Sequence, residues 1–404
     1  MRADHDILIV GGGQAGRRAA QGARAANPDA SIAILGEEAH PPYDRPELSK
    51  KILLGEDPAI CFQMTPEAYA AARISLLPGQ RARAIDPLRR TVATEDGDRY
   101  SYRRLVLATG SRPRKLKTPA DPSILTLRSF EDAAGIAGQL VPGRHVAIIG
   151  AGFIGLEVAA AARARDCSVA IHEAGPRVMA RTMPEAAARQ VEAFHRAHGV
   201  VFHFGRDVGT IVARPDCIGF DANGIHHKAD LVVIGIGIVP NIELAAEAGL
   251  AVEDGILADQ QGRTSSEYVF VAGEVAAHPV LGRDAPARIE SWHVAEYQAE
   301  NAGRNAAGEA MAYRAAPWFW SDQYDHNIQS LGFVGSDDAL IHRTYDDRAC
   351  SHVAVDAEGR LKGIIAINAG KDIAAARRII AAGQKLDPAR LADPAVALKA
   401  AVAG

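Results

Sequence analysis

The stretch Ile7-Leu8-Ile9-Val10-Gly11-Gly12-Gly13-Gln14-Ala15-Gly16 sets an apolar run directly before a glycine-rich turn and an alanine-rich segment. This order predicts a strand, a tight turn and a helix. Glycines at Gly11, Gly13 and Gly16 let the backbone approach a pyrophosphate, which then lies at the positive N-terminus of the helix. A single match to this pattern is only a weak indication of a nucleotide site.

The same arrangement returns at Val146–Ile149, followed by Gly150-Ala151-Gly152-Phe153-Ile154-Gly155. In each case an acidic residue, Glu37 or Glu173, lies roughly 20–25 positions after the first glycine, at the end of a predicted second strand. A carboxylate there accepts hydrogen bonds from ribose hydroxyls. Either glutamate alone would be interpreted as a solvated surface charge, but the paired spacing favours ribose binding. Two such units predict two bound dinucleotides, and the usual reason to hold two is to pass a hydride between them.

The composition is that of an ordinary globular protein, with 404 residues, 48% of them hydrophobic and 23% charged. This length predicts two or three domains. The net charge of −4 argues against a nucleic-acid partner. No apolar run approaches membrane-spanning length, and the first predicted strand starts too close to Met1 for a signal peptide. We therefore expect a cytoplasmic protein that binds neither nucleic acid nor a membrane.

Predicted strands and helices alternate over about the first 315 residues, as in doubly wound α/β domains. Three more apolar runs end at glycine turns, where ligands bind in open α/β sheets, and these are Leu105–Gly110, Leu231–Gly235 and Tyr268–Glu274. From about Pro317 the pattern changes to alternating segments followed by a helical stretch. These are Ala339–Tyr345, Ser351–Val355, Leu361–Asn368 and Asp372–Ala382.

The expected fold is therefore α/β, with two Rossmann-like dinucleotide-binding domains and a small α+β C-terminal domain. The expected boundaries are 1–112 with 240–316 for the first domain, 113–239 for the second and 317–404 for the third.

Two further segments carry a family resemblance. Pro42–Lys50, PYDRPELSK, resembles the P-Y-x-R-P-x-L-S-K stretch of flavin-dependent ferredoxin reductases, and Pro317–Gln323, PWFWSDQ, resembles the opening of their C-terminal domain. The order of these motifs and of the glycine turns is similar over nearly the whole chain. The chain thus resembles the NADH-dependent flavoprotein ferredoxin reductases of bacterial cytochrome P450 and ring-hydroxylating oxygenase systems, the group of putidaredoxin reductase and the biphenyl dioxygenase reductase. That resemblance implies a glutathione-reductase-like fold.

The resemblance also implies that the first glycine unit binds FAD and that the second binds NADH as a substrate. Residues implied to contact FAD are Gly11, Gly13, Ala15, Gly16, Glu37, Arg45, Lys50, Ala82, Thr109, Gly110, Arg128, Glu274 and Trp292. Residues implied to contact NAD are Gly150, Gly152, Phe153, Ile154, Gly155, Glu157, Glu173, Arg181, Gly235, Ile236 and Gly237. Because a carboxylate at Glu173 repels a 2′-phosphate, we expect NADH to be preferred over NADPH.

The implied reaction is hydride transfer from nicotinamide to flavin, for which the protein supplies geometry and electrostatics. By the resemblance, Lys50 points toward the isoalloxazine and Glu157 lies near the nicotinamide, and we predict that these two residues and Trp320 act at the reacting rings. A helix that opens after Ser291 is expected to stabilise the charge that develops on reduced flavin. Without the family motif, Lys50 would be interpreted as a surface lysine.

One position departs from the family pattern. The chain has Gly273-Glu274 where the family usually has Gly-Asp, whose carboxylate binds the ribityl chain of FAD. The additional methylene requires the helix or the flavin to shift, or a water to rearrange. We still expect FAD to bind.

The four cysteines, Cys61, Cys167, Cys217 and Cys350, are far apart and form no CxxC pair. The segment Glu38–Lys50, where related disulfide reductases carry reactive thiols, contains none. We therefore expect electrons to leave the flavin one at a time for an external acceptor, and an acidic [2Fe-2S] ferredoxin fits.

The sequence indicates a partner surface less clearly. Basic residues that could attract an acidic partner are Arg112, Arg114, Lys115, Lys117, Arg304, Arg314, Lys371, Arg377 and Arg378. Ordinary solvated charge is an equally good interpretation of each cluster. The histidines show no metal-ligand spacing, so no metal site is predicted. A monomer or a weak homodimer is expected.

Two other functions stay open. One is an NADH-dependent reductase of rubredoxin, monodehydroascorbate or a quinone. The other is an NADH-sensing flavin-binding protein of the apoptosis-inducing-factor type, in which a stable charge-transfer complex changes partner choice. The chain has no long basic insert to favour the sensor.

Overall fold

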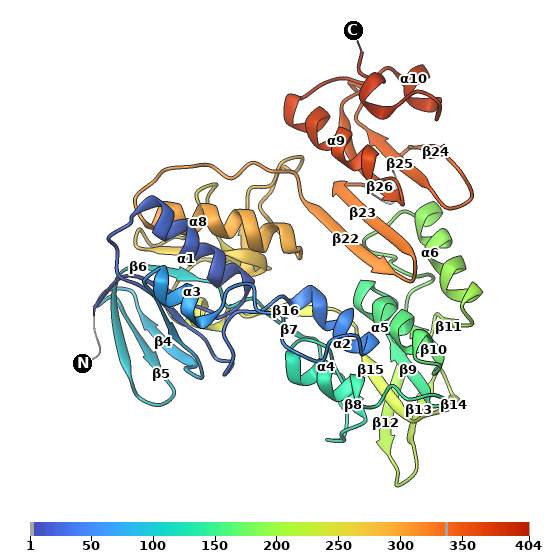
Figure 1. The fold of residues 1–404 in the computed structure, drawn as a ribbon, viewed down its shortest axis with the longest axis horizontal. Coiled ribbons are helices and arrows are strands. Elements are labelled where there is room, and N and C mark those ends of the chain that lie inside the picture. Colours follow the sequence, from blue (N-terminus) through green and yellow to red (C-terminus); the bar gives the residue numbers. More distant parts are fainter. Residues whose placement is uncertain (1–3, 336–337, 404) are drawn as a thin grey trace. The chain divides into compact units, whose positions relative to one another are not determined.

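The computed structural model describes residues 4–335 and 338–403, and the chain divides into two compact units (Figure 1). The first unit contains the chain up to Asp44, Ile60–Arg112 and Val239–Pro317. The second contains Arg45–Ala59, Pro113–Ile238 and the chain from Trp318 onward. The chain passes between the units five times, after Asp44, Ala59, Arg112, Ile238 and Pro317, and two of these passages lie within β7 (Ser111–Pro113) and β16 (Ile238–Pro240).

A seven-stranded sheet lies at the centre of the first unit, in the order β3-β2-β1-β6-β5-β4, with β19 also paired to β6. Its strands are β1 (His5–Val10), β2 (Ile32–Leu35), β3 (Ile74–Leu77), β4 (Ala82–Asp86), β5 (Thr91–Thr94), β6 (Arg99–Leu107) and β19 (Val269–Val271). The pairs among β1, β2, β3, β6 and β19 are parallel, whereas β4 and β5 are antiparallel. This parallel core is the arrangement that the first glycine pattern predicts.

The apolar run before the first glycine turn is buried on both faces of this sheet. Ile7 and Ile9 pack with residues of α1 (Gln14–Ala26) and α8 (Ala299–Ala306) on one face. Leu8 and Val10 belong to the core on the other face. Successive side chains of a strand point to opposite faces, so a continuous apolar run is what a doubly covered parallel strand requires.

Helices α1 and α8 approach each other with no room for side chains at their crossing. A Cβ at Gly303 would lie 2.0 Å from the carbonyl oxygen of Ala19, and one at Gly22 would lie 2.3 Å from that of Glu300. A five-residue π-helix, Val294–Gln298, leads directly into α8. The helix starts after Ser291, whose Oγ accepts a hydrogen bond from the backbone N–H of Val294, so the predicted helix start is confirmed.

A buried carboxylate, Glu296, joins this π-helix to α1. It accepts hydrogen bonds from the side chains of Gln14 and Arg17, and its Oε2 lies 2.9 Å from Nε of Arg18. Burial raises the pKa of Glu296, and the charges of Arg17 and Arg18 oppose that rise. The cluster fixes the helix that follows the first glycine turn.

Smaller elements complete the first unit. They are α3 (Pro66–Ala71), α7 (Glu243–Glu247), the 3-10 turn Gly273–Val275 and a four-stranded sheet of β17 (Val252–Glu253), β18 (Gly255–Leu257), β20 (Ala276–His278) and β21 (Ala287–Arg288). The Gly273–Val275 turn follows β19 directly and carries the predicted FAD ligand Glu274.

The second unit repeats the strand–turn–helix arrangement on a five-stranded parallel sheet in the order β11-β10-β9-β15-β8. Its strands are β8 (Ile124–Leu125), β9 (His145–Ile149), β10 (Ser168–Glu173), β11 (Val201–Phe204) and β15 (Leu231–Ile234), and its helices are α4 (Phe130–Ala137), α5 (Phe153–Ala164) and α6 (Glu185–Ala197). A three-stranded antiparallel sheet of β12 (Val208–Ala213), β13 (Ile218–Ala222) and β14 (Ile225–Ala229) packs on β9 and β15 through a shared apolar cluster.

The C-terminal part has its own five-stranded antiparallel sheet, in the order β22-β23-β26-β25-β24. Its elements are β22 (Trp318–Gln323), β23 (His326–Gly332), β24 (Leu340–Thr344), β25 (Cys350–Val355), β26 (Leu361–Ile367), α9 (Gly370–Ala382), α10 (Pro388–Ala392) and the 3-10 turn Leu398–Ala400. The α+β prediction for this region is confirmed.

This C-terminal part belongs to the same compact unit as the second nucleotide sheet. Nε2 of His195 on α6 lies 2.9 Å from Oε1 of Gln323 on β22. The segment with the 3-10 turn Arg45–Leu48 and α2 (Lys51–Leu54) also belongs to this unit. The division into three domains with the boundaries given above stays a prediction. Within the described ranges, no helix is both long and apolar enough to span a bilayer.

Candidate functional site

The first glycine turn is built for close backbone packing. Gly11 has a φ of +125°, and a Cβ on it would lie 2.0 Å from the carbonyl oxygen of Ala108. A Cβ on Gly16 would lie 1.9 Å from the carbonyl oxygen of Gly11, so the helix can approach the strand only with glycine there. Gly13 is the N-cap of α1. These are the roles that the sequence pattern predicts for the first and third glycines.

The second glycine turn repeats this geometry and adds one further observation. A Cβ on Gly150 would lie 2.3 Å from the carbonyl oxygen of Gly235, and one on Gly155 would lie 2.3 Å from that of Gly150. By contrast, a Cβ on Gly152 would meet nothing within 4 Å. Packing within the protein therefore explains why glycine is needed at positions 150 and 155, but it does not explain the glycine at position 152. Open space beside the middle glycine is what a pyrophosphate lying close to the backbone needs.

Both helices that follow these turns have open N-termini. Neither α1 nor α5 has a side-chain cap or an acidic residue in its first turn. The N-terminus of α4, in contrast, has a complete capping box made by Ser129 and Asp132. Free N–H groups and the positive end of the helix dipole favour an anion at α1 and at α5. The residues present thus fit two dinucleotide pyrophosphates, one in each unit.

The two predicted ribose ligands differ in their surroundings. Oε2 of Glu173 accepts a hydrogen bond of 2.7 Å from the N–H of Ala151, and Oε1 accepts one of 2.7 Å from the N–H of Gly175. Glu173 is therefore fixed against the second glycine turn. Glu37 is exposed, and its Oε1 lies 3.5 Å from Nη1 of Arg81, next to the predicted adenine neighbour Ala82 on β4. Among the residues that the structure describes, this first carboxylate is held only by a surface ion pair.

Thr109 and Gly110 are fixed by the Pro-Asn segment that follows β16. Oγ1 of Thr109 donates a hydrogen bond of 2.8 Å to the carbonyl oxygen of Asn241, and Nδ2 of Asn241 donates one of 2.8 Å to that of Thr109. The backbone N–H of Asn241 also bonds to the carbonyl oxygen of Gly110. Sequence reasoning noted both motifs but missed that they bind each other.

The departure at Glu274 is accommodated without loss of the turn. Gly273 has a φ of +80°, and a Cβ on it would lie 2.5 Å from the Cβ of Ala15. This contact places Glu274 beside the first glycine turn. Oε1 of Glu274 accepts a hydrogen bond of 2.7 Å from Oγ of Ser111, so the longer side chain already has a partner within the first unit. Trp292 is half-buried at the first turn of the helix that starts after Ser291.

The second unit brings the three predicted reaction residues together. Glu157 on α5 is only 6% exposed. It accepts hydrogen bonds from the hydroxyls of Ser49 and of Ser321 on β22, the latter at 2.5 Å. Burial raises the pKa of Glu157, against opposing effects from the charge of Lys50 and from the two hydroxyls.

Lys50 lies between this carboxyl group and strand β22. Its Nζ is 3.8 Å from Oδ2 of Asp322 and 5.2 Å from the centre of the Trp320 ring. The ion pair of Lys50 is thus with Asp322, and the charge of Lys50 also acts on Glu157. Sequence reasoning assigned no role to Ser49, Ser321 or Asp322, although all three lie inside the quoted family motifs.

The remaining predicted residues of the second unit lie around α4 and the turn after β15. Nη1 of Arg45 donates a hydrogen bond of 2.6 Å to the carbonyl oxygen of Arg128, whose own N–H bonds to Asp132. Gly237 has a φ of +98°, and a Cβ on it would lie 3.3 Å from Nη2 of Arg181. Arg181 therefore lies beside the turn of Gly235 and Ile236 that meets the second glycine turn.

The two side chains after Gly152 point to different environments. The rings of Phe153 and Phe319 are 4.2 Å apart, which joins α5 to β22, and Ile154 is 45% exposed in the first turn of α5. The contacts of all these residues with bound cofactor stay predictions.

Comparison with known proteins agrees with the two nucleotide sheets and the C-terminal part described above. Residues 5–299 match the pyridine nucleotide-disulphide oxidoreductase family, and residues 318–402 match a family described as reductase C-terminal. The chain is 43% identical over 402 residues to the ferredoxin–NAD(+) reductase component of an anthranilate 1,2-dioxygenase system from Burkholderia cepacia, with 97% of this chain and 98% of the relative covered.

Two further matches agree. The chain is 35% identical over 395 residues to the ferredoxin–NAD(+) reductase component of a p-cumate 2,3-dioxygenase system from Pseudomonas putida, with 97% of each covered. Among solved structures, it is similar to the covalent putidaredoxin reductase–putidaredoxin complex, with a TM-score of 0.93, 33% identity and 98% of each chain covered.

Proposed function

The chain belongs to the pyridine nucleotide-disulphide oxidoreductase family, and we propose that it is an FAD-dependent NADH:ferredoxin reductase. It passes electrons from NADH to a ferredoxin that supplies a ring-hydroxylating oxygenase or a cytochrome P450. The observation that carries this function is the pair of glycine turns with open helix N-termini, combined with similarity to ferredoxin reductases over the whole chain. The cytoplasm, where NADH is available, is the proposed location.

FAD supplies the redox chemistry, because it takes a hydride and releases single electrons. The chain contributes position and electrostatics. We propose that Lys50, Glu157 and Trp320 adjoin the reacting rings, which is supported by their convergence in the second unit. The hydroxyls of Ser49 and Ser321 hold the Glu157 carboxyl in one orientation, and its raised pKa favours a neutral group there.

The preference for NADH is proposed from Glu173. Its carboxylate is held against the turn by the N–H groups of Ala151 and Gly175, and in that place it would repel a 2′-phosphate. Replacement of Glu173 by Gln is expected to lower the ratio of kcat/KM for NADH to kcat/KM for NADPH.

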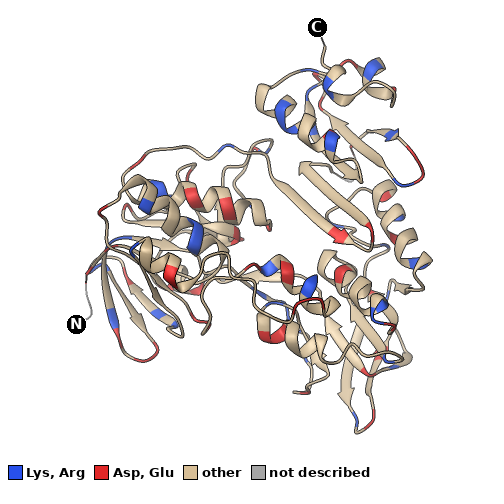
Figure 2. Ribbon diagram, in the orientation of Figure 1, with Lys and Arg blue, Asp and Glu red and all other residues tan. Residues whose placement is uncertain are grey.

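We propose helix α9 as part of the surface that attracts an acidic ferredoxin. Lys371, Arg377 and Arg378 are exposed on this helix (Figure 2), and none of the three has an ion-pair partner among the described residues. The guanidinium of Arg377 lies 5.2 Å from the centre of the Trp318 ring, which stacks on Trp320. In contrast, Arg112 and Arg304 are already paired with Glu243 and Glu300. The monomeric or weakly dimeric state stays a prediction.

The function is tested by anaerobic rapid mixing of the purified flavoprotein. NADH is expected to bleach the flavin absorbance rapidly, and a [2Fe-2S] ferredoxin is expected to restore it rapidly. Fast reoxidation by a quinone but not by ferredoxin would favour another acceptor. Slow reduction to a long-lived charge-transfer species would favour the sensor function.

The second nucleotide site is tested by Gly152→Ala. Because a Cβ there meets nothing in the protein, the variant is expected to fold with an unchanged melting temperature. The same methyl group would displace a pyrophosphate, so KM for NADH is expected to rise at least about tenfold, equivalent to about 1.4 kcal/mol. Gly135→Ala, whose Cβ would lie 3.6 Å from a Leu125 methyl group, is the matched control. An unchanged KM in Gly152→Ala would argue against this site.

A further inference from the structure

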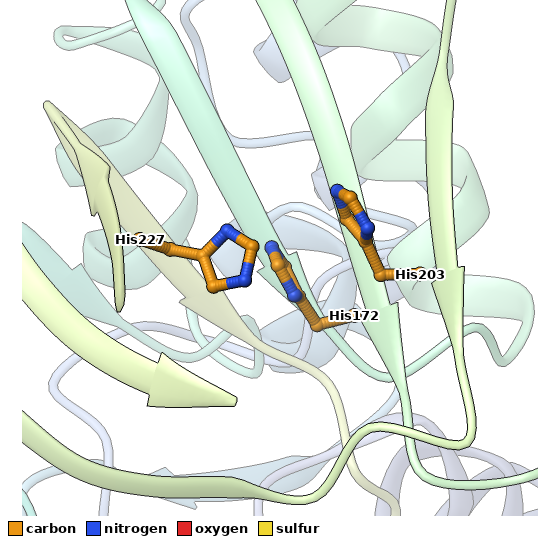
Figure 3. A group of neighbouring side chains, drawn as sticks. All are labelled: His172, His203 and His227. Atoms are coloured by element: carbon orange, nitrogen blue, oxygen red, sulfur yellow. The ribbon is translucent and has the colours of Figure 1, made fainter. Parts of the chain in front are cut away.

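Three histidines that are far apart in the sequence converge within the second unit (Figure 3). They are His172 on β10, His203 on β11 and His227 on β14. Strands β10 and β11 are parallel neighbours with His172 directly opposite His203, and β14 brings His227 from the three-stranded sheet. One ring nitrogen from each histidine lies within 4.8 Å of the other two. Separations of 31 and 24 residues match no local metal-binding spacing, and sequence reasoning therefore did not predict the group.

The central ring of this group has an unsatisfied nitrogen. His172 is 1% exposed, and within residues 4–335 and 338–403 its Nδ1 has no hydrogen-bond partner. Its ring centre is 4.7 Å from that of His203 and 4.5 Å from that of His227, at interplanar angles of 20° and 74°. A buried polar atom without a partner costs stability, and an apolar side chain would fill the same space without that cost. The nitrogen therefore points to an occupant that the protein chain does not itself supply.

All three imidazoles are in the form that binds a metal. Burial lowers the pKa of His172 to about 3, and it also lowers the pKa of His203 and of His227. The charge of Arg206 lowers the pKa of each ring further. The rings are consequently neutral at pH 7, and each keeps a lone pair on one nitrogen for coordination.

We propose that His172, His203 and His227 form a binding site for a divalent first-row transition ion of the zinc class. Imidazole nitrogen suits Zn²⁺, Co²⁺, Ni²⁺ and Cu²⁺, and three protein ligands leave a fourth position for water or an anion. With Zn–N bonds of about 2.0–2.1 Å, tetrahedral ligand atoms lie roughly 3.3 Å apart. The ring nitrogens lie within 4.8 Å of one another, so binding has to bring them up to about 1.5 Å closer. The half-buried ring of His203, which is stacked on that of His172, also has to turn so that its nitrogen faces the ion. The ion would tie β14 to β10 and β11.

The surroundings of the group make a distinctive prediction about charge. Arg206 acts on all three rings, so its positive charge opposes a bound dication. Removal of that charge is expected to tighten metal binding, whereas loss of a ligand weakens it. Adventitious binding at other surface histidines would show neither response.

The test uses the flavin-loaded protein without an affinity tag, after chelator treatment. Calorimetric titration with Zn²⁺ and elemental analysis after dialysis are expected to give one ion per chain and a higher melting temperature. His203→Gln and His227→Gln are expected to weaken binding at least about 30-fold, and Arg206→Gln is expected to tighten it several-fold.

His226→Gln is the matched control, because His226 is adjacent to His227 in the sequence but lies outside the group of three histidines. Its Nδ1 lies 3.2 Å from Oδ1 of Asp221. The affinity of this variant for Zn²⁺ is expected to change less than twofold. The melting temperature of each variant without metal shows whether it is folded. No stoichiometric binding, or equal binding by the wild-type chain and both ligand variants, would overturn the proposal.

Discussion

The two units each contain a buried carboxyl group, and the two are stabilised in different ways. In the first unit Glu296 lies among Gln14, Arg17 and Arg18, so cationic side chains surround it. In the second unit Glu157 accepts hydrogen bonds from the neutral hydroxyls of Ser49 and Ser321. Burial raises the pKa of both groups.

The difference separates a structural role from a reactive one. The charges of Arg17 and Arg18 oppose the effect of burial on Glu296 at the joint between two helices, where loss of one partner leaves a buried charge unpaired. Hydroxyl groups can accept as well as donate, so the Ser49–Glu157–Ser321 arrangement tolerates a protonated or an ionised carboxyl group. We therefore propose Glu157 as the carboxyl group whose protonation changes during turnover.

The largest expected effect on stability concerns Glu296, the carboxyl group that is held by ion pairs. Arg17→Met removes a buried partner of Glu296 and is expected to lower the free energy of unfolding by about 3–5 kcal/mol. Urea unfolding followed by circular dichroism measures it. Arg304→Met, which breaks more exposed pairs with Glu300 and Glu309, is the control and is expected to cost less than about 1 kcal/mol. Equal losses of unfolding free energy in the two variants would show that the buried ion pair of Glu296 stabilises the fold no more than the more exposed pairs of Arg304.

A smaller effect on stability is expected for Glu157, the carboxyl group that is held by hydroxyl groups. Ser321→Ala deletes the hydrogen bond to Glu157 and the one that Oγ accepts from Nε2 of Gln323. It is expected to cost about 1–3 kcal/mol, because an ordinary hydrogen bond contributes about 0.5–1.5 kcal/mol. The same urea experiment measures it, with Ser330→Ala on the neighbouring strand as the control. A loss no larger than that of the control would show that the hydroxyl does not hold the carboxyl group.

The dependence on pH distinguishes the two carboxyl groups directly. Because the pKa of Glu157 is raised, its protonated form stabilises the folded protein below the ordinary value of 4.5, and this stabilisation is lost as pH rises through the folded-state pKa. Glu157→Gln, which stays neutral, is therefore expected to gain stability relative to the wild-type chain between pH 5 and pH 8.

Melting temperatures across that pH range measure this trend. Glu192→Gln on α6, a half-buried partner of the exposed Arg196, should show no such trend. Glu296→Gln should be less stable than the wild-type chain at pH 8, because it leaves the buried Arg17 without a counter-charge. Parallel curves for Glu157→Gln and the wild-type chain would contradict the prediction.

The smallest effect on stability is expected for Lys50→Met. The ion pair with Asp322 is long at 3.8 Å, and the Asp322 side chain is 46% exposed, so its loss should cost less than about 1 kcal/mol. If Lys50 acts at the reacting rings, bleaching of the flavin by NADH should slow markedly in the same variant. A melting temperature that falls sharply while the bleaching rate is unchanged would make Lys50 a structural residue.

Local patterns in the sequence predicted most of the fold. The strand before each glycine turn, the turn and the helix are confirmed to within one or two residues, because hydrophobic spacing and glycine requirements act over short distances. Three of the five C-terminal strands were located equally well, with Ser351–Val355 expected and Cys350–Val355 observed, whereas β22 and β23 were not predicted.

Contacts between distant segments could not be predicted in this way. Ser49 and Ser321 reach Glu157 across 108 and 164 residues, and Arg17 meets Glu296 across 279. The three histidines meet only because the three-stranded sheet that contains β14 packs against the parallel sheet that contains β10 and β11. Nothing in the spacing of these residues encodes their proximity, which depends on how the sheets and helices pack.

The close crossing of α1 and α8 has a consequence for the order in which the protein folds during synthesis. Gln14 and its partner Glu296 are 282 residues apart, so at about 5–20 residues per second α1 leaves the ribosome roughly 15–60 s before its partner. Residues 113–238, which form the second nucleotide sheet, are contiguous and are complete earlier. Residues 113–238 are therefore expected to resist protease on stalled nascent chains of about 280 residues. In the same chains Glu296 has not yet been synthesised, so α1 is still expected to be cleaved.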